Sequence, residues 1–150
     1  MPSQLIEKRI ASHEISEEVD QGVLDFGTQL HQLLEVVDYE KKDLSFIRDK
    51  RLAQCVSNVF MTSLFSNVKN ENLRHEFKFY DAKNQIHGVI DCLIMSQEEI
   101  KIVDFKLKNI DDEQYIKQLH AYRDYVRSIS ALPIRMYLIS AMTGEEREIE

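Results

Sequence analysis

The sequence has only two cysteines, Cys55 and Cys92. Two thiols are too few for an iron–sulfur cluster held by four cysteines, which excludes that cofactor. Their spacing matches no disulfide framework, which fits a reducing compartment. Because Cys92 follows an acid within an apolar stretch, we expect a small core residue there rather than a nucleophile.

Long hydrophobic runs are also missing. No apolar run approaches the ~18 residues of a membrane-spanning helix, and residues 1–7 lack a signal-peptide pattern. We therefore expect a cytoplasmic protein with no membrane partner. No Gly-x-x-x-x-Gly-Lys-Ser/Thr phosphate loop is present, so any ATP-driven motor would lie outside these 150 residues.

Positive charge is scarce, since the formal net charge is −7. This is the main argument against a nucleic-acid partner, because DNA binding normally needs a basic surface. The acids are concentrated in residues 14–20, 35–43 and 145–150. Basic residues instead cluster in the last third of the chain: Lys106, Lys108, Lys117, Arg123 and Arg127. Weak, salt-sensitive DNA binding is therefore the expectation.

At 43% hydrophobic residues, with no repeats or low-complexity linkers, the chain is expected to form a single domain over residues 1–150. Apolar periodicity, caps and turn residues predict the elements in this order: an arm or short helix at residues 1–13, a helix from Ser16 to about Val37, a helical segment Asp43–Phe65, strands Leu73–Tyr80, Ile86–Met95 and Ile100–Leu107, a helix capped within Asn109–Glu113 and ending near Ser128, a strand Ile134–Ala141, and a turn at Thr143–Gly144 into an acidic end. A helix between the third and fourth strands permits a right-handed crossover, so we expect a mixed sheet flanked by helices.

Two acids stand inside apolar strands of this prediction, Asp91 and Asp104. A carboxylate in an apolar strand needs a cation or several donors to offset its lost hydration. If the two strands pair antiparallel, both acids can converge on one hard divalent cation such as magnesium. Lys106 shares a strand face with Asp104, with Phe105 on the other, and would stabilise charge on a phosphate under attack.

Gly88-Val-Ile-Asp91 followed by Asp104-Phe-Lys106 resembles the signature of PD-(D/E)xK nucleases, in the form found in RecB-type and AddA-type nuclease domains. Three further motifs of those domains have counterparts here. The early Gly-x-x-x-His is similar to Gly27 to His31, the strand glutamate to Glu76, and the Gln-x-x-x-Tyr helix motif to Gln118 to Tyr122. The resemblance spans roughly residues 26–140.

The resemblance implies a restriction-endonuclease-like αβββαβ core with additional N-terminal helices. It also implies that His31, Asp91, Asp104 and the backbone carbonyl of Phe105 hold one Mg²⁺ or Mn²⁺ ion. Lys106 would then act on the attacking water and the phosphate. Gln118 and Tyr122 would face the active site, and Glu76 would join it. Leu107 stands where the family usually has threonine, so that contact is missing or is supplied by Lys108.

Each of these residues also has a purely structural interpretation. His31 could be a partly buried histidine bonded to backbone, Glu76 a solvated strand residue, and Gln118 and Tyr122 a solvated amide beside a packed ring. His75 and His87 are expected to be surface or strand histidines rather than ligands.

The function that the resemblance implies is exonuclease-like DNA hydrolysis in recombination or repair. Such domains accompany a helicase, so we expect a helicase partner in the same or another chain, and a chain that is a fragment of a larger helicase–nuclease. A non-catalytic interaction module and a stand-alone restriction or repair endonuclease are the alternatives.

Overall fold

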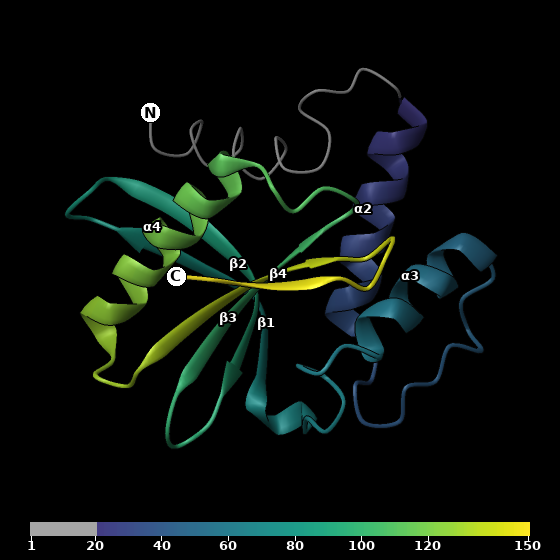
Figure 1. Ribbon diagram of the computed structural model, residues 1–150, viewed down its shortest axis with the longest axis horizontal. Coiled ribbons are helices and arrows are strands. Elements are labelled where there is room, and N and C mark those ends of the chain that lie inside the picture. The colour runs from purple at the N-terminus through teal and green to yellow at the C-terminus, as the bar shows by residue number, and fades with distance from the viewer. Residues whose placement is uncertain (1–20) are drawn as a thin grey trace.

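The computed structural model describes residues 21–150, and the expected arm at residues 1–13 and helix start at Ser16 lie outside the described residues. The elements (Figure 1) are α2 (Gln21–Val36), α3 (Lys50–Phe60), the short 3-10 helix η1 (Asn70–Asn72), β1 (Leu73–Asp81), β2 (Ile86–Met95), β3 (Ile100–Lys106), α4 (Glu113–Ile129), β4 (Ile134–Ser140) and β5 (Glu146–Ile149). Of the described helices, none is long and apolar enough to cross a membrane.

The strands form one mixed sheet in the order β1-β2-β3-β4-β5. Neighbouring strands pair antiparallel except β3 and β4, which pair parallel because α4 carries the chain across between them. The predicted mixed α/β arrangement is confirmed for the described residues.

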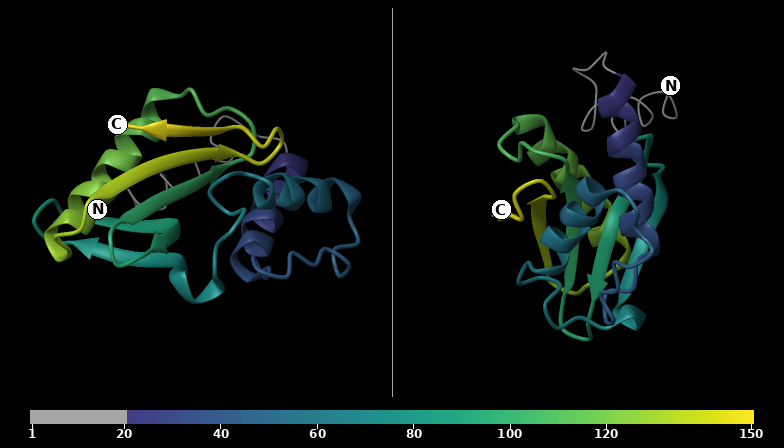
Figure 2. Two further views of the ribbon diagram at one scale, coloured as in Figure 1. Left: turned by 60° about the horizontal axis from the view of Figure 1, so that its bottom comes forward. Right: turned by 90° about the vertical axis from the view of Figure 1, so that its right-hand side faces the viewer.

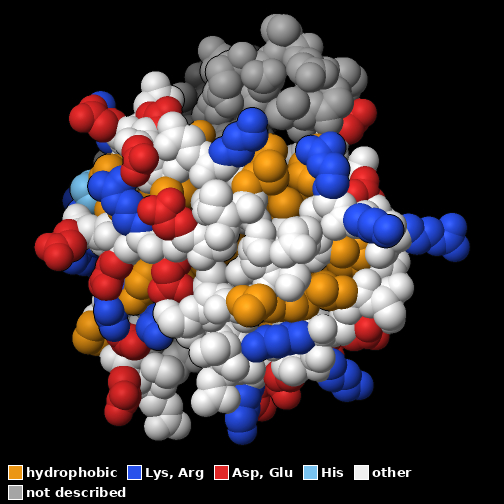
Figure 3. Space-filling model, turned by 45° about the vertical axis from the view of Figure 1, so that its right-hand side comes forward, with side chains coloured by type: hydrophobic (Ala, Val, Ile, Leu, Met, Phe, Trp, Pro, Cys, Tyr) orange, Lys and Arg blue, Asp and Glu red, His pale blue; other side chains and the backbone are white. Residues whose placement is uncertain are grey.

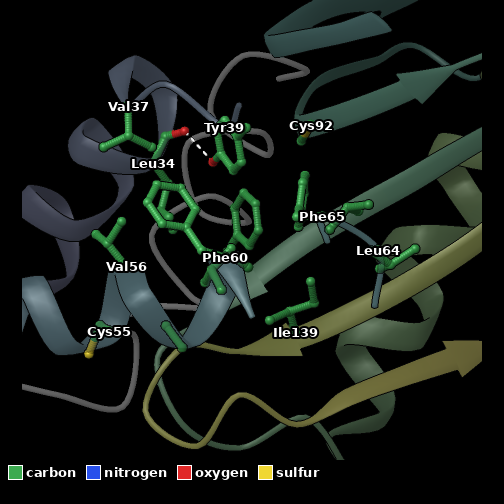
Figure 4. Close-up of a cluster of buried hydrophobic side chains, with 14 of the residues drawn as sticks. Leu34, Val37, Tyr39, Cys55, Val56, Phe60, Leu64, Phe65, Cys92 and Ile139 are labelled. Atoms are coloured by element: carbon green, nitrogen blue, oxygen red, sulfur yellow. Dashed lines mark hydrogen bonds between the residues drawn. The ribbon is translucent and has the colours of Figure 1, made fainter. Parts of the chain in front are cut away.

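Helices cover both faces of this sheet. One buried cluster joins α2 and α3 to side chains such as Cys92, Val103 and Ile139 (Figure 4), and a second joins α4 to Ile90, Ile102 and others. The views of Figure 2 show α2 and α3 together, apart from α4. The free thiol of Cys92 is fully buried, and burial raises its pKa, so the prediction of a core residue is confirmed.

The second helix is shorter than the predicted Asp43–Phe65. Asp49 caps α3, because its carboxylate accepts hydrogen bonds from the backbone N–H groups of Arg51 and Leu52. Before it, Asp38 and Asp43 bond to backbone N–H groups two or three residues ahead and hold the chain in turns. The apolar spacing that predicted one helix therefore covers both the loop before Asp49 and the helix α3.

The acidic end of the chain is a strand, which the sequence prediction missed. Gly144 makes the predicted turn with a φ of +78°, and β5 then returns along β4. Glu148 forms a bidentate ion pair with Arg135, with N–O distances of 2.8 and 2.9 Å, and Ile149 is buried. Glu148 is thus an ion-pair partner of the neighbouring strand rather than part of a free acidic tail.

The inward face of β1 reverses at Glu76. Leu73 contributes to the cluster under α2 and α3, whereas Phe79, which standard alternation would put on the same face, lies in the cluster under α4. Glu76 lies between them with a φ of +50°, outside the ladder that joins β1 to β2. On β2 the same change occurs between Cys92 and Ile90, so the reversal on that strand is centred on Asp91, which the register of the ladder also skips.

Gly88 makes room for an aromatic group on the neighbouring strand. A Cβ at this position would lie 2.2 Å from ring atoms of Phe79, its partner in the register. That ring stacks on Tyr125 at 4.2 Å and meets Tyr122 edge-on at 5.8 Å between centroids. The glycine of the Gly-x-x-Asp motif therefore lets β1 pack directly against α4.

His75 lies on β1, as expected of a strand histidine, with its ring stacked on Tyr39 at 5.3 Å. Tyr39 in turn donates a hydrogen bond from its hydroxyl to the carbonyl of Leu34 at 2.6 Å, the contact drawn in Figure 4. The Nδ1 atom of His75 is buried without a hydrogen-bond partner. Burial lowers the pKa of this imidazole, an effect that the charge of Glu35 partly offsets.

Replacing His75 by phenylalanine should make the fold less sensitive to acid. Below pH 6.5 the His75 imidazole binds a proton in the unfolded chain but not in the folded chain. The free energy of unfolding therefore decreases as the pH is lowered, by at most about 1.4 kcal/mol per pH unit for one group. Urea unfolding at several pH values between 5 and 7.5, in EDTA, should show a shallower loss for His75→Phe. The same dependence of stability on pH in the two proteins would contradict a lowered pKa for His75.

Candidate active site

A fork between β2 and β3 creates the site. The antiparallel ladder between these strands runs from Met95 and Ile100 to Cys92 and Val103 and ends there, whereas β3 continues beside β4 through Lys106. The edge of β3 that faces β2 is therefore open beyond Val103. Backbone groups on such an edge need other partners.

Two side chains supply those partners for Phe105. The carboxylate of Asp91 accepts the backbone N–H of Phe105 at 2.9 Å, and the Nε2 atom of His31 lies 3.1 Å from its carbonyl oxygen. His31 Nε2 is also 3.2 Å from the same Asp91 oxygen. On the other side of the ring, Nδ1 lies 3.2 Å from the carbonyl of Gly27, one helical turn earlier in α2. The sequence motif Gly27 to His31 is thus a local geometry that fixes the ring.

The arrangement of these atoms suits a divalent cation. Two oxygen acceptors face Nε2, so a proton or a metal ion is needed among them. Ligand atoms of an octahedral ion with bonds of about 2.1 Å lie about 3 Å apart, close to the separations of 3.1 and 3.2 Å found here. Donation from Nδ1 to a backbone carbonyl would leave Nε2 available as a ligand. Within the described part of the chain, however, no three His, Cys, Asp or Glu side chains are grouped to hold a metal.

Asp104 is paired with the lysine instead. Its carboxylate lies 2.5 Å from Nζ of Lys106, and both side chains are only 1% exposed. Lys106 also donates a hydrogen bond to Oε1 of Gln118 on α4 at 3.2 Å. This second cluster faces α4, whereas the His31 cluster faces α2, and the backbone of Phe105 joins the two. The structure thus brings Lys106 and Gln118 together with Asp104, and His31 together with Asp91.

Glu76 lies beside the first cluster. It interrupts the ladder of β1 and β2 between the pair of His75 with Cys92 and the pair of Phe77 with Ile90, and it is partly buried. Burial raises the pKa of Glu76, and the negative charges of Asp91 and Glu35 raise it further, while His31 lowers it. This electrostatic coupling is not that of a fully solvated edge glutamate.

Tyr122 is buried one helical turn after Gln118, and its ring meets Phe79 edge-on. The sequence prediction missed Tyr115, whose ring lies 4.2 Å from Nζ of Lys106. The i, i+3 spacing of Tyr115 and Gln118 on the predicted helix was a signal that could have found it. His87 lies on β2 with its ring against Tyr80 at 4.6 Å.

The fold and the two clusters define an α/β protein with a carboxylate, imidazole and lysine site at a fork in a mixed sheet. No protein-family model matches the chain. The chain is 24% identical, over 173 aligned positions, to an ATP-dependent helicase/nuclease subunit of Clostridium beijerinckii. The similarity covers 95% of this chain but only 14% of the length of that protein.

The buried pair of Asp104 and Lys106 makes a prediction about stability. Lys106→Met or Asp104→Asn alone should each lower the free energy of unfolding by about 3–5 kcal/mol, because each leaves one buried charge without its partner. The double variant should lose much less than the sum of the two. Urea unfolding of the four proteins measures this coupling.

Lys101→Met is the matched control, since Lys101 lies on the same strand but is partly exposed and 3.8 Å from Glu99. It should cost about 0–1 kcal/mol. Additive losses in the double variant would show that the two charges are not coupled in solution. Because Asp104 is the partner of Lys106 in this pair, Asp104→Ala would also lower folding stability, whatever its effect on activity.

Proposed function

We propose that this chain is a metal-dependent deoxyribonuclease domain of the PD-(D/E)xK type, with the restriction-endonuclease-like core of RecB-type and AddA-type nucleases. The observation that carries the proposal is the fork, where His31 Nε2 lies 3.2 Å from the Asp91 carboxylate and 3.1 Å from the Phe105 carbonyl, beside a buried Asp104 and Lys106. The similarity to a protein named as part of a helicase/nuclease supports it.

His31, Asp91, Asp104 and the Phe105 carbonyl would hold one Mg²⁺ or Mn²⁺ ion. When bound, the ion supplies Lewis-acid polarisation of the scissile phosphate and activation of water. Carboxylate and carbonyl oxygens suit either ion, and an imidazole ligand favours manganese. For Asp104 to join, its carboxylate must give up part of its contact with Lys106.

Lys106 is the residue assigned to the phosphate. Its ammonium would orient the attacking water and stabilise the negative charge that grows on the phosphate oxygens. Gln118 directs it, because the amide oxygen accepts one of its three protons. We assign Glu76 on β1 and Tyr122 on α4 to positioning of water or of the DNA strand, as the family resemblance implies.

A domain with a net charge of −7 would bind DNA only weakly by itself. Figure 3 shows acidic and basic side chains interspersed around exposed apolar groups on one face, rather than a continuous basic surface. We therefore propose that a helicase, in the same or a partner chain, delivers the strand for hydrolysis during recombination or repair.

The proposal predicts metal-dependent cleavage of DNA. End-labelled single-stranded and double-stranded DNA should be cut by the 150-residue chain with Mn²⁺ or Mg²⁺ and left intact in EDTA. The double variant Asp104→Asn with Lys106→Met, chosen because it keeps the buried site neutral, should lose cleavage by about 10²–10³-fold or more. Lys101→Met should cut as the parent protein does.

Cleavage that persists in EDTA or in the double variant would contradict the proposal. If no DNA is cut, calorimetry with Mn²⁺ separates two explanations. Metal binding without cleavage would indicate a domain that needs its helicase. Absence of metal binding would favour the alternative, a nuclease-like fold that serves as a non-catalytic interaction module.

A further inference from the structure

The ammonium of Lys106 has a third neighbour besides Asp104 and Gln118. Its Nζ atom lies 4.2 Å from the centroid of the Tyr115 ring. A cation over an aromatic face is attracted by the negative charge density of the ring, most strongly where water is excluded. Lys106 is 1% exposed, so this attraction acts in a dry environment.

The role of Tyr115 follows from competition for Asp104. If a metal ion draws on the Asp104 carboxylate, the ion pair at 2.5 Å weakens. Lys106 then keeps one neutral amide oxygen, at 3.2 Å on Gln118, and the face of the Tyr115 ring. These two partners come from α4 and do not depend on Asp104. A buried ammonium with fewer partners would otherwise be poorly held in the site.

The first turn of α4 fixes this ring. Asp112 caps the helix by accepting the backbone N–H of Gln114, and the backbone N–H of Tyr115 bonds to the Asp112 carbonyl at 3.0 Å. Gln118 follows Tyr115 by three residues, so both side chains project from one face of the helix. The capped turn therefore presents the ring and the amide to Lys106 as one rigid unit.

We propose that Tyr115 is a positioning residue that holds the Lys106 ammonium in place through the face of its ring while Asp104 binds metal. The inference rests on the proposed nuclease function. It requires the aromatic face and not the hydroxyl, so phenylalanine should replace tyrosine and an aliphatic residue of similar volume should not.

The test compares Tyr115→Phe and Tyr115→Leu in the full 150-residue chain. With Mn²⁺ and end-labelled DNA, Tyr115→Leu should lower kcat by about tenfold with KM unchanged, and Tyr115→Phe should stay within about twofold of the parent. Tyr125→Leu is the matched control, because it removes an aromatic ring from the same helix where that ring stacks on Phe79. It should leave kcat unchanged.

A second measurement reports on the contact without any cleavage. The ε-methylene protons of Lys106, observed by NMR in lysine-labelled protein, should be shifted upfield by the ring current of Tyr115. The shift should persist in Tyr115→Phe with Mg²⁺ present and disappear in Tyr115→Leu.

Five outcomes decide between these possibilities. Loss of kcat and of the upfield shift in the leucine variant only supports the inference. An active parent protein with equal kcat in all variants overturns it and leaves the proposed function standing. A rise in KM alone would make Tyr115 a DNA contact, and a fall in kcat for Tyr115→Phe would assign the role to the hydroxyl, so either overturns it. A parent protein that cuts no DNA with any metal overturns the positioning role and the nuclease activity of the isolated chain together.

Discussion

The backbone of Phe105 is the point on which the site depends. Because β2 leaves β3 after Cys92 and Val103, the N–H and C=O groups of Phe105 lose a strand partner and take the Asp91 carboxylate and the His31 ring instead. An unsatisfied buried backbone group costs about as much as a lost hydrogen bond. The strands can therefore separate here because these two side chains replace the missing strand partner. The same step gathers an imidazole nitrogen, a carboxylate oxygen and a carbonyl oxygen at one place.

The fork also explains why charged groups can be buried deep in a small domain. Asp104 and Lys106 flank Phe105 and project toward α4, where the ion pair, the Gln118 amide and the Tyr115 ring share the cost of dehydration. Removal of water strengthens every remaining electrostatic interaction in the site. Folding stability and the proposed chemistry thus draw on the same few contacts. Glu76, where β1 reverses, is coupled electrostatically to Asp91 and His31 in the other cluster.

The sequence predicted much of this arrangement because local patterns determine it. Alternating apolar residues located β1 to β4 to within a residue or so of their ends, and the Asp-x-Lys spacing put Asp104 and Lys106 on one strand face. Long-range pairing was harder to foresee. The acidic segment of β5 becomes a strand through its pairing with β4 and the ion pair of Glu148 with Arg135, and no local pattern marks Glu76 for a positive φ. Tyr115 was missed because a ring near a helix start resembles ordinary packing.

We propose that His31 and Asp91, held at the fork, bind a divalent cation. Pulsed electron paramagnetic resonance of Mn²⁺ bound to the protein tests it most directly, since a nitrogen ligand modulates the spin echo. We expect a single bound ion with one imidazole nitrogen coupling, which vanishes in His31→Gln while the fold persists. Bound manganese without nitrogen coupling, or coupling that survives in His31→Gln, would contradict it.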